Sequence, residues 1–275
     1  MHPWMLVETT CVTELEYYFA CTLVLVLVMT IMQEEVVVFD LQINWSKTKI
    51  RQLPLSMACW TVQVADGHVE MVDAFVYLGS MIDSSGGSRG GILRRIGIAR
   101  SCMNLLEKRI WKSSIRLDTK IRLYQTYIVP VVLYGCETWS TTKLQCSRTD
   151  AFDMWALRMI LRIPYTRHVT NVEVRSTTGC HPLSHLVTDR RLQLFEHIAR
   201  SSPQEDHHRA VAAVIRGLPP DWKRPLGRCS HTWLCAVEAD LGQQNIGLAS
   251  VWRKAAIRDD WRHIVDTAML QRSML

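Results

Sequence analysis

Residues 89–110 read RGGILRRIGIARSCMNLLEKRI, and this stretch decides the fold class. Its apolar residues recur three or four positions apart, a spacing that places them on one face of an α-helix. The sequence therefore predicts an amphipathic helix whose other side is basic. The apolar face consists of Ile92, Ile96, Ala99, Met103, Leu106 and Ile110, and the basic side chains are Arg94, Arg95, Lys108 and Arg109.

A second amphipathic helix is predicted to begin at Asp118, because aspartate is a residue type that caps helix N-termini. Pro130 is expected to kink or interrupt this helix, since proline lacks a backbone N–H and crowds the preceding turn. Gly135 is the expected end. The side chains predicted to face inward are Ile121, Tyr124 and Ile128.

A third helix is predicted to take Ser147 as its cap and to stop before Pro164, because the residue that precedes proline avoids the helical region. Three amphipathic helices in succession are typical of a small helical bundle. The inward side chains of the third helix are predicted to be Phe152, Trp155, Met159, Ile160 and Ile163.

The regions on either side of these helices differ in type. Upstream, short β-branched or aromatic runs favour strands. Downstream, the pattern stays helical, and the predicted fold class is therefore mainly α with a small β remnant. The expected strands are Val36–Phe39, Thr61–Val64 and Phe75–Leu78, and the expected further helices are Leu183–Ala199, the segment around Ala210–Ile215, Thr232–Leu241 and Ser250–Leu270.

Positive charge is concentrated in one block. The chain of 275 residues is 48% hydrophobic and 21% charged, which is ordinary for a globular protein, and its formal charge is +6. Between Gly87 and Gln125, ten Lys and Arg stand against two acidic residues, a net charge of +8. Such a block is typical of proteins that bind nucleic acid. We expect RNA or DNA to be the partner of this basic block, residues 87–125.

One apolar segment raises the question of a membrane. Tyr17–Met32 is 16 residues long, shorter than the roughly 20 residues that a spanning helix needs. Acidic residues flank it on both sides, whereas a signal peptide has a basic segment in front. A buried strand or helix is the favoured interpretation, and a membrane anchor stays open as the alternative.

The cysteines predict reduced thiols in an intracellular protein, cytoplasmic or nuclear. There are nine of them, an odd number, and no Cys-x-x-Cys pair occurs, which argues against both a disulfide framework and a standard zinc site. Cys180, His181 and His185 with His197 do not have the spacing of a zinc finger. No metal and no other cofactor is expected.

Three segments carry a resemblance to a known family. Residues 44–50 read NWSKTKI, residues 69–80 read VEMVDAFVYLGS and residues 133–139 read LYGCETW. In this order they resemble the end of the palm, the primer-grip hairpin and the thumb helix of LINE-type (non-LTR) retrotransposon reverse transcriptases. The likeness covers about residues 40–265 and includes Arg190-Arg191-Leu192. It departs from the family at Glu196, where glycine is usual, and at residues 227–233, which have lost most of the family's basic residues.

The resemblance implies four regions. Residues 1–35 are a divergent apolar segment, 36–86 a palm remnant with the hairpin, 87–165 a thumb-like helical bundle and 166–275 a helical carboxy-terminal region. It also implies contacts to nucleic acid from the motif lysines, the hairpin and the first bundle helix. For Lys47 and Lys49, a plain surface position is the favoured interpretation, because the catalytic aspartates are missing. For Arg94–Arg109 taken without the resemblance, a solvated helix face stays open as the alternative, since any amphipathic helix places polar residues outward. The implied residues are Lys47, Lys49, Tyr77, Gly79, Arg94, Arg95, Lys108 and Arg109.

The chemistry of polymerisation is not found in this sequence. Nucleotide transfer needs carboxylates that hold two magnesium ions roughly 4 Å apart. The family carries them in an early palm motif and in a later Y-A-D-D hairpin, and neither motif is present in the 275 residues. Asp259 and Asp260 are adjacent on a predicted helix, so their side chains point about 100° apart. We therefore expect a chain cut off downstream of the catalytic aspartates and without enzyme activity.

A rival hypothesis belongs to a different functional class. The chain could be a helical protein–protein interaction module, or a pseudogene product with no specific activity. A salt-dependent affinity for RNA or DNA distinguishes the two readings, because phosphate contacts release counterions.

Overall fold

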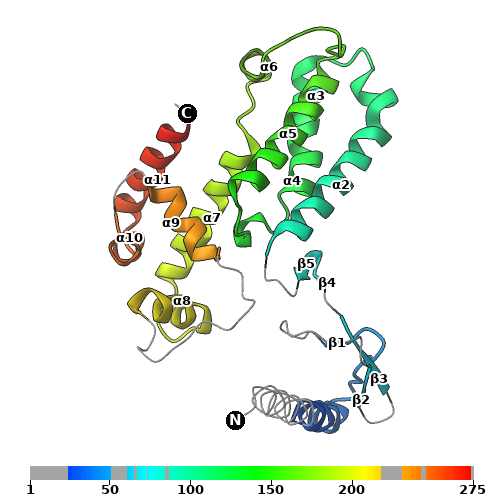
Figure 1. Ribbon diagram of the computed structural model, residues 1–275, viewed down its shortest axis with the longest axis vertical. Coiled ribbons are helices and arrows are strands. Elements are labelled where there is room, and N and C mark those ends of the chain that lie inside the picture. The colour runs from blue at the N-terminus through cyan, green and yellow to red at the C-terminus, as the bar shows by residue number, and fades with distance from the viewer. Residues whose placement is uncertain are drawn as a thin grey trace, which may run out of the picture. The chain divides into compact units, whose positions relative to one another are not determined.

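The computed structural model describes residues 24–50, 61–64, 67–72, 74–83, 87–217, 231–242 and 246–273 (Figure 1). The chain divides into two compact units, Met1–Phe75 and Val76–Leu275. Helices predominate in the described residues and the strands are few and short, so the predicted fold class, mainly α with a small β portion, is confirmed. None of the described helices has the length and apolar content needed to cross a membrane.

The first unit opens with a helix whose described part covers residues 24–37. The predicted strand Val36–Phe39 is wrong, because residues 36–37 end this helix and residues 38–40 form a turn. A short apolar run reads the same on a strand and at the end of a helix, so periodicity alone could not decide between them. Of the apolar segment Tyr17–Met32, residues 24–32 are helical and residues 17–23 lie outside the described part.

A three-stranded sheet completes this unit. It consists of β1 (Lys49–Ile50), β2 (Thr61–Val64) and β3 (Gly67–Met71) in the order β1-β3-β2, with β1 parallel and β2 antiparallel to β3. The predicted strand at 61–64 is therefore confirmed. A Cβ added to Gly67 would lie 2.4 Å from Cγ of Trp45, so only glycine fits at this position. The core of the unit is Val62, Val64 and Val69, with Val26, Met29, Trp45 and Ile50 packed against it.

A hairpin precedes the helical bundle. Strand β4 (Ala74–Tyr77) pairs with β5 (Ser80–Asp83), and the residues between them, Leu78 and Gly79, form the turn. The predicted strand Phe75–Leu78 is confirmed except at Leu78, which belongs to the turn.

The long basic helix is present as predicted. Helix α2 (Arg89–Leu106) continues into the π-helical segment η1 (Glu107–Trp111). The π segment adds one residue to the turn, and it is Trp111 that becomes fully buried there. The indole N–H of Trp111 donates to the carbonyl of Met103 at 2.9 Å. The whole predicted stripe faces the core, with Ile92, Ala99 and Met103 buried and Ile96, Leu106 and Ile110 packed against them.

The second helix has three segments, α3 (Leu117–Leu123), the π-helical η2 (Tyr124–Ile128) and α4 (Val129–Val132). Asp118 is not its cap, because the helix begins one residue earlier and Asp118 instead pairs with Arg116 in the first turn. The π segment lies directly before Pro130, where a regular turn would push the proline ring against the carbonyl of the residue four positions earlier. Pro130 thus alters the helix without ending it, and Gly135 follows the last turn with a φ of +71°.

The third helix, α5 (Lys143–Ile160), begins four residues before the predicted cap. Ser147 is inside the helix. The cap is Thr142, whose hydroxyl accepts from the backbone N–H of Gln145 at 3.4 Å while the Gln145 amide oxygen accepts from Thr142 N at 2.8 Å. This capping box satisfies two otherwise unpaired backbone donors, which a single serine five residues later could not do. The helix ends before Pro164, as predicted.

The remaining helices are α6 (Asn171–Thr178), α7 (Leu183–Arg200), α8 (Asp206–Arg216), α9 (Trp233–Leu241), α10 (Leu248–Ala255) and α11 (Arg258–Ser273). The predicted single helix Ser250–Leu270 is wrong, because residues 256–257 form a turn between α10 and α11. Asp259 and Asp260 favour this break, since acidic groups stabilise the first turn of a new helix. Helix α6 was not predicted.

Helix α7 belongs to two hydrophobic cores. Leu183 and Val187 in its first half pack with α2, α4 and α5, while Leu192 and Phe195 in its second half pack with α9, α10 and α11. Figure 1 shows α7 between these two groups of helices. One helix therefore connects the bundle to the carboxy-terminal helices.

Candidate nucleic-acid interface

Two of the sequence segments that carry the resemblance lie against each other. The hydroxyl of Tyr134 donates to the carbonyl of Leu78 at 2.8 Å, which joins the hairpin turn to the segment after α4. A Cβ added to Gly79 would lie 3.3 Å from Cε1 of Tyr134, and one added to Gly135 would lie 3.1 Å from Oγ of Ser80. Each glycine thus allows the close approach of a residue from the other segment.

The hairpin turn has an unusual backbone. Leu78 has a φ of +46° and Gly79 a φ of +78°. Glycine adopts such values freely, but a leucine there costs about 1 kcal/mol or more. The side chains around the turn nevertheless point outward, with Tyr77 58% and Leu78 74% exposed. An aromatic and an apolar side chain are therefore held in solvent at a strained turn, the kind of outlier that is found at binding sites.

Two consecutive arginines of α2 reach this turn in different ways. The Arg95 guanidinium lies over the ring of Tyr134, 4.1 Å from its centroid, and also donates to the carbonyl of Gly79. Burial, and after it the neighbouring charge of Arg94, lowers the pKa of Arg95. Arg94 is exposed and reaches the same carbonyl at 3.3 Å. Arg95 is thus part of the packing, whereas Arg94 remains accessible to a ligand.

Lys108 and Arg109 lie at the far end of the same helical stretch. Both are exposed on η1, and neither forms an ion pair with any residue in the described ranges. At 1.5 Å per residue, Lys108 is about 20 Å along the helix from Arg94. Accessible cations therefore lie at both ends of this helical stretch.

Other cations of the basic block have structural partners. Arg100 lies over the ring of Trp155 at 4.9 Å, and Lys112 pairs with Glu107 at 2.8 Å. Lys120 is buried and donates to the carbonyls of Trp111 and Ser113, both at 2.8 Å, and burial lowers its pKa. The count of ten basic residues thus overstates the charge that a ligand could meet.

Lys47 and Lys49 belong to the first unit. Lys49 pairs with Glu70 at 2.7 Å across β1 and β3, where the two residues are in register. Lys47 is exposed in the turn before β1. The structure thus brings together Tyr77, Gly79, Arg94 and Arg95 but leaves the two motif lysines in a separate compact unit.

The segment 133–141 has a structural role that the sequence did not reveal. Besides the contact of Tyr134, its backbone accepts hydrogen bonds from Arg190 at Leu133 (3.2 Å), from Arg191 at Trp139 (2.6 Å) and from Trp233 at Glu137 (2.7 Å). Arg190 and Arg191 are on α7, and Trp233 begins α9. The segment therefore holds α7 and α9 through its carbonyl groups and the hairpin through the Tyr134 hydroxyl. In the sequence, this anchoring role was indicated only by the family resemblance of LYGCETW (residues 133–139) and of Arg190-Arg191.

The chain is similar to a protein of transposon origin. A Caenorhabditis elegans protein described as transposon-derived is 23% identical to it over 208 residues, which cover 73% of each chain. This similarity points to an origin in a transposable element. No family model matches the chain, and no solved structure matches it.

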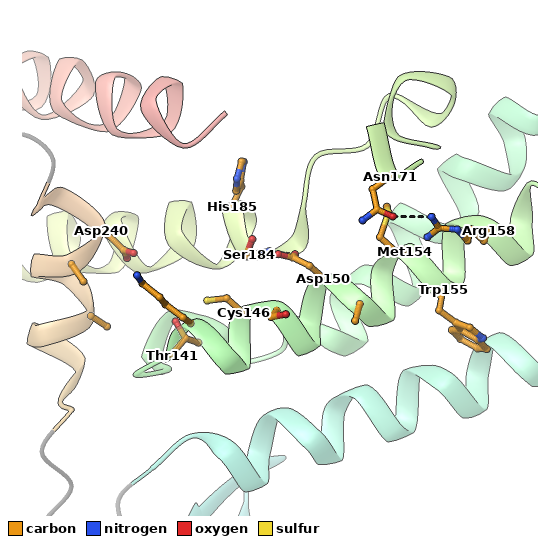
Figure 2. A pocket seen from close by; sticks show the side chains of 15 residues that line it. Thr141, Cys146, Asp150, Met154, Trp155, Arg158, Asn171, Ser184, His185 and Asp240 are labelled. Carbon is orange, nitrogen blue, oxygen red and sulfur yellow. Dashed lines mark hydrogen bonds between the residues drawn. The ribbon is translucent and has the colours of Figure 1, made fainter. Parts of the chain in front are cut away.

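A second surface feature lies between helices α5, α6, α7 and α9. It is an open groove of about 930 Å³, shown in Figure 2. Asp150 on its wall accepts from the backbone N–H of Ser184 at 2.9 Å, and Asp240 pairs with Arg191 at 2.8 Å. Arg158 donates to the carbonyl of Val169 at 3.0 Å and to Asn171 Oδ1 at 2.8 Å (the latter dashed in Figure 2). The groove therefore combines apolar surface with charged groups of both signs.

Cys180, His181, His185 and His197 were the candidate metal ligands of the sequence. In the part of the chain that the structure describes, which includes Cys180, His181, His185 and His197, no group of three metal-ligating side chains comes together.

Proposed function

We propose that this chain is a remnant of a LINE-type reverse transcriptase that binds RNA or DNA and does not polymerise nucleotides. The motif order and the similarity to a transposon-derived protein support this origin. In the proposed arrangement, residues 69–80 are the primer-grip-like segment, whose residues 74–80 belong to the β4–β5 hairpin, and residues 87–165 are the thumb-like bundle.

One observation carries the binding proposal. The exposed Tyr77 and Leu78 are held beside the accessible Arg94, at one end of a helical stretch whose other end carries the exposed Lys108 and Arg109. An aromatic side chain can stack on a base, and cations spaced along a helix can neutralise successive phosphates. The combination fits a single strand or a strand end better than it fits a protein partner.

The proposal that the chain does not polymerise nucleotides rests on the geometry of its adjacent carboxylates, Asp259 and Asp260. Asp259 and Asp260 are exposed in the first turn of α11, and Asp259 lies 3.7 Å from Arg262. Adjacent helical residues diverge by about 100°, so these two side chains do not share one face as a two-metal site needs. Magnesium-dependent primer extension that is lost on changing both aspartates would contradict this proposal.

Fluorescence anisotropy with a short labelled RNA strand and a short DNA duplex, over a series of salt concentrations, tests the binding proposal. In the triple variant Arg94→Gln, Lys108→Gln, Arg109→Gln, the slope of log affinity against log salt should fall by roughly 0.7 per lost contact on single strands and 0.9 on duplexes. Helix content should hardly change, because glutamine and arginine have similar helix propensities.

A charge-matched control separates a local contact from a general charge effect. Arg216, Arg253 and Lys254 are exposed on α8 and α10, and changing all three to glutamine removes the same charge. This control should keep the wild-type slope. Equal slopes for the wild type and both triple variants would favour the helical interaction module over a nucleic-acid-binding remnant.

A further inference from the structure

The hairpin β4–β5 has little support of its own. Its two strands pair only with each other among the described strands, and an isolated two-stranded hairpin is marginally stable in water. Its turn is also strained at Leu78. The position of the exposed tip therefore depends on contacts outside the hairpin, those of β5 with α2 and those of the turn itself. The contacts of the turn are the ones closest to the tip.

Those contacts converge on two neighbouring carbonyl groups. Tyr134 binds the carbonyl of Leu78 from the segment after α4, while Arg95 and Arg94 bind the carbonyl of Gly79 from α2. Arg95 also lies on the Tyr134 ring, 4.1 Å from its centroid, so these two side chains form one connected clamp. The segments that meet here are 56 and 16 residues apart in the sequence.

We infer that Tyr134 and Arg95 are positioning residues that hold the tip Tyr77–Leu78 at a set distance from the accessible cations of α2. This inference rests on the proposed nucleic-acid binding. A ligand that touches both the tip and Arg94 loses less conformational entropy on binding when the tip is already ordered. Arg95 thus contributes to affinity without contacting a phosphate, unlike its neighbour Arg94.

Two conservative variants isolate the clamp. Tyr134→Phe removes the hydroxyl and leaves the ring under Arg95, and Arg95→Lys keeps the charge but loses the planar group that binds the carbonyl and stacks on the ring. Tyr127→Phe and Arg253→Lys are matched controls, because both side chains are exposed, on η2 and α10, and both lie outside the basic block 87–125.

The clamp variants should each weaken RNA binding about fivefold, the size expected from losing one hydrogen bond, with no change in salt slope. Amide hydrogen exchange in residues 76–83 should become faster in the free protein, while exchange in α2 and α5 stays as in the wild type. The two control variants should behave as the wild type in both measurements. Arg94→Gln should instead lower the slope of log affinity against log salt by the amount that corresponds to one lost phosphate contact.

Two results would overturn the inference. Unchanged exchange at residues 76–83 in Tyr134→Phe would mean that the hydroxyl does not hold the turn. A slope that falls in Arg95→Gln as much as in Arg94→Gln would make Arg95 a phosphate contact. If the wild-type chain binds neither RNA nor DNA, the proposed function fails, and the exchange measurement still decides whether the clamp orders the hairpin.

Discussion

Arg191 Nε lies 2.8 Å from Asp240 Oδ2, in an ion pair between α7 and α9 whose side chains are 2% and 4% exposed. Nη1 of Arg191 also donates to the carbonyl of Trp139 and to the hydroxyl of Thr141, at 2.6 and 3.0 Å. One guanidinium thus joins the carboxy-terminal helices to the segment that anchors the hairpin. Its desolvation is offset by several directed partners, the condition under which a buried ion pair is tolerated.

Replacing Arg191 by glutamine should therefore reduce the free energy of unfolding by about 3–5 kcal/mol, because Asp240 would be left buried without its charge partner. Urea denaturation followed by circular dichroism measures this. Arg209→Gln is the matched control, since Arg209 pairs with Asp206 at the exposed surface and should matter by less than about 1 kcal/mol. If the two substitutions changed the free energy of unfolding equally, the buried ion pair would contribute no more to stability than the exposed one.

Alanine substitutions at three glycines distinguish the effect of steric crowding on stability from the effect of backbone strain. Gly79→Ala should be the most destabilising, because its Cβ would lie 2.7 Å from Nη2 of Arg95 and its φ is +78°. Gly179→Ala has the strained φ of +65° but open space, and should cost about 1 kcal/mol. Gly97→Ala has open space inside α2 and should stabilise by roughly 0.5–1 kcal/mol. Thermal unfolding gives the order, and a destabilising Gly97→Ala would contradict it.

Asp153 makes stability depend on pH in a defined direction. Burial raises the pKa of Asp153 above its ordinary value of 3.8, although the Tyr124 hydroxyl (2.6 Å) and Arg175 (2.6 Å) partly oppose this. The native state then holds this proton to higher pH than the unfolded state does. The contribution of Asp153 to stability is therefore largest below pH 3.8 and falls as pH rises through its raised pKa.

Urea denaturation of the wild type and of Asp153→Asn across this pH range isolates the effect. The wild type should lose stability relative to the variant as pH rises from about 4, and the difference should become constant above the raised pKa. A wild type that instead gains stability relative to Asp153→Asn as pH rises would mean that Arg175 outweighs burial and lowers the pKa of Asp153. Tyr124→Phe should extend the affected range upward, because it removes a donor that favours the carboxylate.

The sequence by itself determined the features that depend on neighbouring residues. Spacings of three and four placed Ile92, Ala99 and Met103 in the core, and Pro164 limited the third helix. These signals succeed because helix periodicity and proline sterics act within a few residues. The same locality explains the errors. The continuous apolar run Val36–Phe39 fits a strand and a helix end equally well. Ser147 has the residue type of a helix cap, but the Thr142–Gln145 capping box is the stronger signal and forms the helix start.

Only the tertiary structure decided which polar side chains are available to a ligand. Arg94 and Arg95 are adjacent and chemically identical, yet one is exposed and the other is packed between Tyr134 and Gly79. Lys120 looks like any surface lysine in the sequence and is buried against two carbonyl groups. The reason is that the partners of these cations are carbonyls and rings brought close by packing, and in Arg95's case they lie on segments 16 and 39 residues away. Residue type and local spacing carry no information about such distant partners, because the free energy of these contacts exists only once the helices have packed.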